Sequence, residues 1–276
     1  MEKRLEVLMS AMNQTDFSIA HRTKVDSDLL IINQCGEDRY DEVEVNGHRW
    51  RMISTTSRGL SKSRNLALDN AEGDICLFCD DDEELCEGYA DIILGAYKEL
   101  PKASAIVFNI KRINYKMKKT YYRIKEARRA PFYRSYGSPM LSFDLAKINK
   151  RGIRMNEHFG SGTPWGGGED NLFQDDMKRC GMKIYEHPSE IATIDYGGGS
   201  LWFHGYTEKY FYNLGAFLRF KYRFNLPMRE ARCLYTCYKL RREKGLSAFR
   251  KLRWMHCGMR GIRKNVTYAE FTEGKK

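Results

Sequence analysis

The chain has 276 residues, of which 42% are hydrophobic and 30% charged, so it can bury one sizeable core but is short for two full-sized domains. Its net charge of +11 arises in residues 208–264, which hold 16 Lys and Arg against 3 acids. No apolar run reaches the roughly 18 residues of a membrane-spanning helix, and the N-terminus does not read as a signal peptide. We predict a cytoplasmic or peripheral membrane protein with a catalytic domain at residues 1–206 and a basic, mainly helical extension at residues 207–276.

Short apolar runs alternate with helical patterns in the first half of the chain, which is typical of buried parallel strands joined by helices. The expected strands are residues 5–9, 29–32, 51–54, 75–79 and 105–110, and the expected helices are residues 58–71 and 87–100. Residues 111–134 are basic and aromatic without a clear period, so we expect a loop there. A helix through Asn171 and a final strand at Ile184 and Tyr185 follow. This order predicts an α/β fold, a mostly parallel sheet with helices on both faces.

The strongest chemical signal is the run Asp80-Asp81-Asp82 directly after the expected strand at 75–79. The two-residue period of a strand projects Asp80 and Asp82 to the same side, at the carboxyl edge where α/β sheets bind ligands. Two such carboxylates suit Mn²⁺ or Mg²⁺, which would hold a nucleotide diphosphate through its phosphate oxygens. The alternative is a solvated acidic turn that opens the next helix. We favour the metal site because the run follows a buried strand.

A second signal is the glycine-rich segment 166–168, which is followed by Glu169 and Asp170 at the start of a helix. Glycines let a backbone approach a ligand closely. An inverting sugar transfer needs a carboxylate that takes the proton from the acceptor hydroxyl, and Asp170 is our candidate base, with Glu169 next in line. Helix capping, which Asp performs well, explains this local sequence equally well.

Taken in order, these motifs resemble the family 2 glycosyltransferases, which have the GT-A fold. The resemblance rests on residues 59–67, residues 72–82 and residues 167–173, and it covers roughly residues 4–215. It implies that Asp80 and Asp82 form the DxD metal site of the family and that Asp170 is the catalytic base of its Glu-Asp motif.

The resemblance also implies a binding site for the donor nucleotide. Ser10, Asn13 and Asn33, at the ends of the first two strands, match positions that hold the nucleoside, and Asp80 belongs to the same site. Lys62 and Arg64 lie on the helix that flanks the diphosphate. Two departures occur: Asn33 and the residues after it replace a usual acidic residue, and the first loop lacks the Pro-x-Tyr-Asn pattern of many members. Both resemble a subgroup from capsule and exopolysaccharide gene sets.

Three further residues carry weaker signals. His204 is a candidate third metal ligand or phosphate donor, as a late histidine is in some GT-A enzymes, although a lone histidine is more often structural. Trp165 and Trp202 are candidates for stacking on the acceptor sugar, and core packing explains each about as well.

The C-terminal extension repeats aromatic and aliphatic residues at helical spacing, with Arg and Lys between them. This composition is typical of an amphipathic helix that lies on an anionic membrane surface. The alternative is a set of helices that pack on the catalytic domain and present their charges to solvent.

The sequence therefore predicts an inverting glycosyltransferase in bacterial surface polysaccharide synthesis. By resemblance, its donor is a UDP-sugar and its acceptor a lipid-linked or other oligosaccharide. A sugar-phosphate nucleotidyltransferase is the rival enzyme, but no Gly-x-Gly-Thr-Arg loop follows the first strand. A nucleic-acid-binding protein would explain the basic extension but not the acidic motifs, so we expect no nucleic-acid partner.

Overall fold

The structure is a computed structural model that describes residues 3–114, 122–197, 205–243 and 245–274. The chain divides into two compact units, Met1–Asn156 with Glu169–Gly199 and Glu157–Gly168 with Ser200–Lys276. This division lies near the predicted boundary after residue 206, except that Glu157–Gly168 groups with the second unit.

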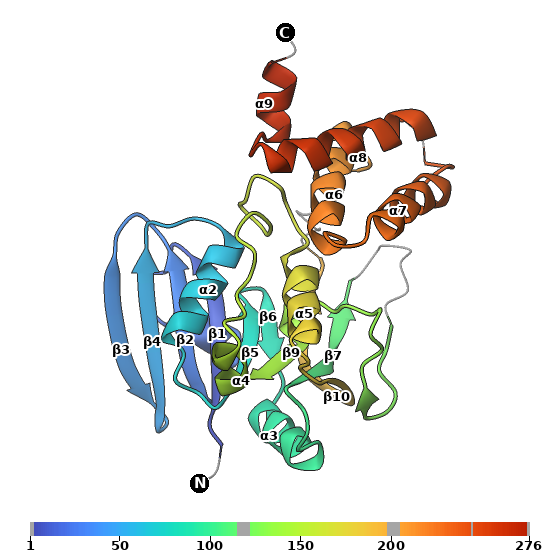
Figure 1. Ribbon diagram of the computed structural model, residues 1–276. Coiled ribbons are helices and arrows are strands. Elements are labelled where there is room, and N and C mark those ends of the chain that lie inside the picture. Colours follow the sequence, from blue (N-terminus) through green and yellow to red (C-terminus); the bar gives the residue numbers. More distant parts are fainter. Residues whose placement is uncertain (1–2, 115–121, 198–204, 244, 275–276) are drawn as a thin grey trace. The chain divides into compact units, whose positions relative to one another are not determined.

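The first unit, which we call the sheet unit, is a sheet flanked by helices (Figure 1). Its strands are β1 (Leu5–Met12), β2 (Asp28–Gln34), β3 (Arg39–Val45), β4 (His48–Thr55), β5 (Ile75–Asp80), β6 (Glu83–Leu85), β7 (Ala105–Ile113), β8 (Arg128–Arg129), β9 (Leu141–Asp144) and β10 (Ile184–Asp195). Its helices are α1 (Ser18–Arg22), α2 (Leu60–Asn70), α3 (Tyr89–Glu99), α4 (Leu145–Lys150) and α5 (Glu169–Arg179), with a 3₁₀ turn, η1, at Ser138–Met140. The loop predicted at residues 111–134 lies partly outside the described residues.

The strand order is β3-β4-β2-β1-β5-β9-β7-β10-β6, and β8 pairs with β10. Strands β4, β2, β1 and β5 run parallel to one another, as the sequence predicts. Strand β9 runs antiparallel between β5 and β7, and β3 and β6 run antiparallel at the two ends of the sheet. The parallel strands therefore deliver their carboxyl ends to one edge, and Asp80 lies at that edge beside Ser10.

Strand β3 was not expected, because it is a largely exposed edge strand. Its many charged residues do not form the apolar run by which the other strands were predicted. Asn46 and Gly47, at φ 52° and 79°, join it to β4. An Asn-Gly pair between alternating residues is a strong hairpin signal, since both positions need a left-handed backbone. The Asn-Gly pair is therefore the sequence signal by which the hairpin could have been predicted.

A buried ion pair fixes the start of the parallel sheet. Arg51 Nη2 on β4 lies 2.5 Å from Glu6 Oε1 on β1, and both side chains are buried. The second oxygen of Glu6 accepts hydrogen bonds from the backbone N–H groups of Glu72 and Gly73, at 2.6 and 2.8 Å. A Cβ added to Gly73 would lie 2.6 Å from the Cβ of Glu6, so only glycine permits this approach.

The second unit is helical and consists, in its described part, of α6 (Glu208–Lys221), α7 (Leu226–Lys239), α8 (Ala248–Arg263) and α9 (Tyr268–Glu273). Its helical character is as predicted. Helices α6 and α8 pack closely because Gly215 and Gly258 lie where they meet: a Cβ on either would come within 2 Å of a carbonyl oxygen of the other helix. Among the described residues, no helix is both long and apolar enough to span a membrane.

The first prediction concerns the buried ion pair. Glu6→Gln should lower the free energy of unfolding by about 3 kcal/mol, because it leaves the buried guanidinium of Arg51 with only Glu72 as an anionic partner. Glu37→Gln is the control, since Glu37 pairs with Arg39 on the exposed surface and should cost less than about 1 kcal/mol. Equilibrium unfolding in urea measures both, and equal losses would contradict the prediction.

Candidate active site

The acidic run lies where β5 ends. Asp80 is the last residue of β5, and Asp81 and Asp82 form the turn to β6, which begins at Glu83. One carboxylate oxygen from each of Asp80, Asp82 and Glu83 lies within 4.8 Å of the other two. The structure thus brings the two predicted metal ligands together and adds a third acid that the sequence analysis did not single out.

Glu83 is the most buried member of this cluster, with 1% of its surface exposed. Neither of its carboxylate oxygens has a hydrogen-bond partner among the described residues. Burial, followed by the charges of Asp80 and Asp82, raises the pKa of Glu83 well above its usual value, and burial and Asp80 also raise that of Asp82. An all-carboxylate donor set with an unpaired buried member fits a hard divalent cation such as Mn²⁺ or Mg²⁺.

Arg64 on α2 links this cluster to the second acidic motif. Its side chain is only 3% exposed and lies over the ring of Phe78, 5.3 Å from the centroid. Its Nη2 donates a hydrogen bond to Asp80 Oδ1 at 2.7 Å, and its Nη1 donates to Asp170 Oδ1 at 3.0 Å. Burial alone would lower the pKa of Arg64, but the carboxylates of Asp80, Asp170 and Glu169 raise it, so the guanidinium remains a cation.

Asp170, in the first turn of α5, is partly open to solvent, with its side chain 25% exposed. Its Oδ1 accepts hydrogen bonds from Arg64 and from the hydroxyl of Ser138 on η1. No described residue donates to Oδ2. One oxygen is therefore held in place, and the other remains available to accept a proton.

Glu169, the alternative base, differs from Asp170 in its surroundings. It is buried, and its Oε1 lies 4.0 Å from Arg64 Nη1. Both acids lie at the N-terminus of α5, where the helix dipole favours negative charge. The greater exposure of Asp170 makes it the more accessible of the two to an incoming acceptor.

The residues predicted to hold the nucleoside lie at the same sheet edge, at the ends of β1 and β2. Ser10 accepts a hydrogen bond from the Ser63 hydroxyl at 2.8 Å, and Asn13 is exposed at φ 54°. The Asn33 amide is buried and bonded to both backbone groups of Gln14, each at 2.8 Å, so it fixes the loop after β1. Lys62 is exposed on α2. Their roles toward a nucleotide stay predictions.

The remaining candidates lie elsewhere. Trp202 and His204 are outside the described residues. Trp165 belongs to the helical unit, where it is buried and stacks on Tyr212 with ring centroids 5.7 Å apart and planes at 6°. Packing therefore accounts for the Trp165 side chain in the structure, and its contact with an acceptor stays a prediction.

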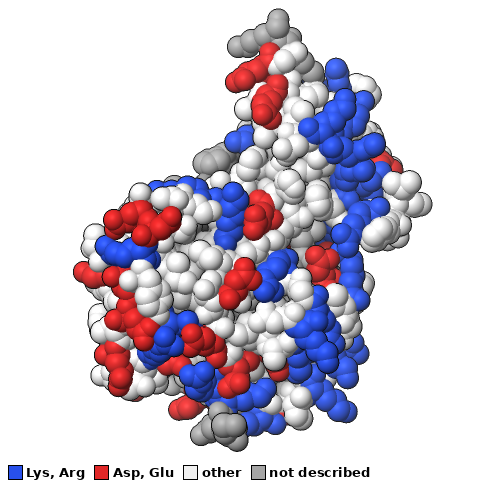
Figure 2. Space-filling model, turned by 60° about the vertical axis from the view of Figure 1, so that its left-hand side comes forward, with Lys and Arg blue, Asp and Glu red and all other residues white. Residues whose placement is uncertain are grey.

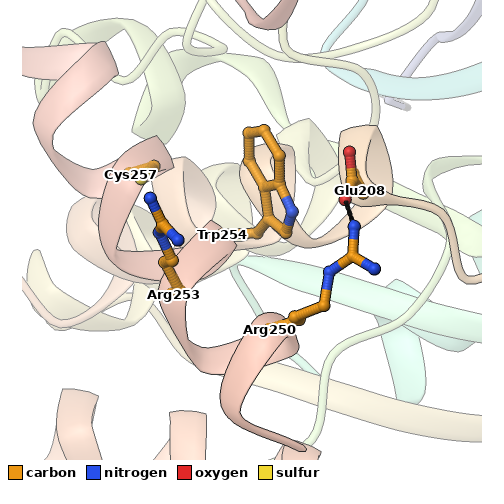
Figure 3. Close-up of a pocket in the computed structure, with 5 residues that line it drawn as sticks. All are labelled: Glu208, Arg250, Arg253, Trp254 and Cys257. Atoms are coloured by element: carbon orange, nitrogen blue, oxygen red, sulfur yellow. Dashed lines mark hydrogen bonds and ion pairs between the residues drawn. The ribbon is translucent and has the colours of Figure 1, made fainter. Parts of the chain in front are cut away.

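Two hollows away from the acidic cluster fit a nucleotide-sugar donor less well. One hollow of about 710 Å³ lies at the amino ends of β1, β2 and β4, which is the edge of the sheet opposite Asp80. Both acidic and basic side chains line it. A pocket of about 150 Å³ in the helical unit is too small for a nucleotide sugar, since small-molecule sites usually exceed about 300 Å³. In it Arg250 already pairs with Glu208 at 2.5 Å, near Trp254 (Figure 3). The carboxyl edge remains the site with matching chemistry.

Comparison with known proteins identifies structures of similar fold. S. aureus TarS 1-349 in complex with UDP-GlcNAc is similar in structure, with a TM-score of 0.58 and 14% sequence identity over 96% of this chain and 93% of that one. TarS 1-349 in complex with UDP gives 0.56 and 15%, over 98% and 77% of the two chains. These similarities show the shared fold. No curated protein matches the chain significantly.

The sequence itself matches the family described as Glycosyl transferase family 2 over residues 4–167, more than half of the chain. That stretch contains α2 with Arg64 and the whole acidic run after β5. The chain therefore belongs to glycosyl transferase family 2.

Proposed function

We propose that the protein transfers one sugar, with inversion, from a UDP-sugar to a hydroxyl of a lipid-linked or other oligosaccharide acceptor. The observation that carries this proposal is the position of the buried Arg64, which contacts both Asp80, a candidate metal ligand, and Asp170, the candidate base. The similar TarS structures contain UDP-GlcNAc and UDP, which supports a uridine nucleotide as donor.

Asp80 and Asp82 would hold a Mn²⁺ or Mg²⁺ ion at the end of β5. When bound, such a cation neutralises charge that develops on a departing diphosphate. Arg64 is held between the two acidic motifs and keeps Asp80 oriented through a charge-assisted hydrogen bond.

Asp170 would act as the general base. Its Oδ2 takes the proton of the acceptor hydroxyl as that oxygen attacks the anomeric carbon on the face opposite the diphosphate. The new carbon–oxygen bond forms while the bond from the anomeric carbon to the diphosphate oxygen breaks, and UDP leaves. Ser138 and Arg64 fix Oδ1, so the carboxylate cannot rotate away from the acceptor.

We place this reaction in bacterial surface polysaccharide synthesis, in a capsule or exopolysaccharide pathway, at an anionic membrane surface. Side chains on and beside α7 support the membrane contact: Phe224 is 86% exposed, and Leu234 and Tyr238 are also exposed. A guanidinium group lies over each of the two rings, with Arg223 4.9 Å from the Phe224 centroid and Arg241 4.1 Å from the Tyr238 centroid. Lys and Arg side chains line one side of the helical unit, at the top of Figure 2. Exposed aromatic residues beside basic ones are typical of interfacial helices.

The second prediction tests the base. Asp170→Asn keeps the size and the capping ability of the side chain but cannot accept the acceptor proton. We expect kcat to fall by roughly 10² to 10⁴ while the affinity for the UDP-sugar stays nearly unchanged. Transfer assays together with calorimetric titration against a panel of nucleotide sugars measure both quantities. Near wild-type turnover would assign the role to another residue, with Glu169 the first to test.

The third prediction tests the membrane contact. Phe224→Ser should weaken co-sedimentation with anionic vesicles, because it removes an apolar side chain that would be buried in the membrane surface. Raised salt should also weaken it, because salt screens the attraction between basic side chains and anionic headgroups. Phe132→Ser is the matched control, since Phe132 is exposed on the sheet unit, and it should leave binding unchanged. Neutral vesicles and RNA are compared at the same ionic strength. Absent binding to anionic vesicles, or stronger binding to RNA, would overturn the membrane assignment.

A further inference from the structure

Glu83 occupies an unusual place for an acid. Strand β6 pairs with β10, and its alternation turns Glu83 and Leu85 inward and leaves Glu84 exposed. The carboxylate of Glu83 is therefore buried one residue beyond the Asp80-Asp81-Asp82 run. Burial of an ionised carboxylate is costly unless a positive charge or hydrogen bonds compensate for it.

The described protein groups do not supply that compensation. Neither oxygen of Glu83 accepts a hydrogen bond from a described residue. Arg64 lies beside the cluster, but its two terminal nitrogens donate to Asp80 and Asp170. Carboxylates of Asp80 and Asp82 lie within 4.8 Å of that of Glu83, and like charges repel one another at such distances. Three carboxylates therefore converge on one point, and Glu83 has no hydrogen-bond donor among the described residues.

We propose that Glu83 is a third carboxylate of the cation site, and that with Asp80 and Asp82 it lets the protein bind Mn²⁺ without any nucleotide. This inference rests on the metal site of the proposed function. A site of two carboxylates relies on ligand phosphates to complete the coordination of the ion, whereas a third carboxylate supplies both another oxygen and another negative charge. The cation would then be in place before the donor arrives.

Glu84 provides a matched control. It is the next residue, it has the same side chain, and it forms an exposed ion pair with Lys24 at 2.7 Å. Glu83→Gln and Glu84→Gln therefore remove the same charge from adjacent positions, and only the first change reaches the cluster.

The fourth prediction is measured on the whole 276-residue chain by titration with Mn²⁺ alone, by calorimetry and by thermal unfolding. We expect Glu83→Gln to weaken Mn²⁺ binding by at least about tenfold, as Asp82→Asn should, while Glu84→Gln stays within about twofold of wild type. In EDTA, Glu83→Gln should unfold at a temperature no lower than that of wild type, because the acid that it replaces is buried and has no hydrogen-bond partner among the described residues. Mn²⁺ should raise the unfolding temperature of wild type much more than that of Glu83→Gln.

Three results would overturn the inference and leave the proposed function standing: Mn²⁺ binding to wild type only when UDP is present, full Mn²⁺ affinity in Glu83→Gln, or a lower unfolding temperature of Glu83→Gln in EDTA. Failure of wild type to bind Mn²⁺ with or without UDP, together with transfer that survives EDTA, would instead remove the metal from the proposed function.

Discussion

The guanidinium of Arg64 lies buried between two acidic motifs that are far apart in the sequence, and the remainder of the site is arranged around it. One nitrogen donates to Asp80 at the end of β5, and the other donates to Asp170 at the start of α5. Carboxylates this close would repel one another without a cation between them. A planar guanidinium suits the position because its donors diverge at fixed angles, which a lysine ammonium cannot reproduce. The position of α2 on the sheet therefore determines how the metal-site acids and the base are arranged relative to each other.

The charges of the site also differ in how fully they are compensated. Asp170 shares Arg64 with Asp80 and receives a further hydrogen bond from Ser138. Glu83 receives none from the described residues, and Asp82 is partly exposed in the turn. The end of the site near β6 therefore has a buried carboxylate without a hydrogen-bond donor among the described residues, while the carboxylate of Asp170 near α5 is held by two donors. This difference matches the two tasks we propose, cation binding at one end and proton transfer at the other.

Much of this arrangement could be predicted from the sequence. The parallel strands, α2 and the acidic run after β5 have local patterns that a short window reveals. The roles of Ser138 and Glu83 could not be predicted in this way. Ser138 meets Asp170 only because η1 and α5 pack in the folded unit, and no spacing in the sequence records that contact. In the sequence, Glu83 and Glu84 look like two equivalent members of a solvent-exposed acidic run. Only the pairing of β6 with β10 shows that Glu83 is buried and Glu84 exposed.

The most direct test of a single site centred on Arg64 is a crystal structure of the protein with Mn²⁺ and a UDP-sugar. We predict the diphosphate and the cation at the carboxyl edge of the sheet, with Asp80, Asp82 and Glu83 on the cation. Arg64 should still contact Asp80 and Asp170, and Asp170 Oδ2 should face the anomeric carbon. A nucleotide bound elsewhere, such as in the hollow at the amino ends of β1, β2 and β4, or an Asp170 turned away from the sugar, would contradict the account.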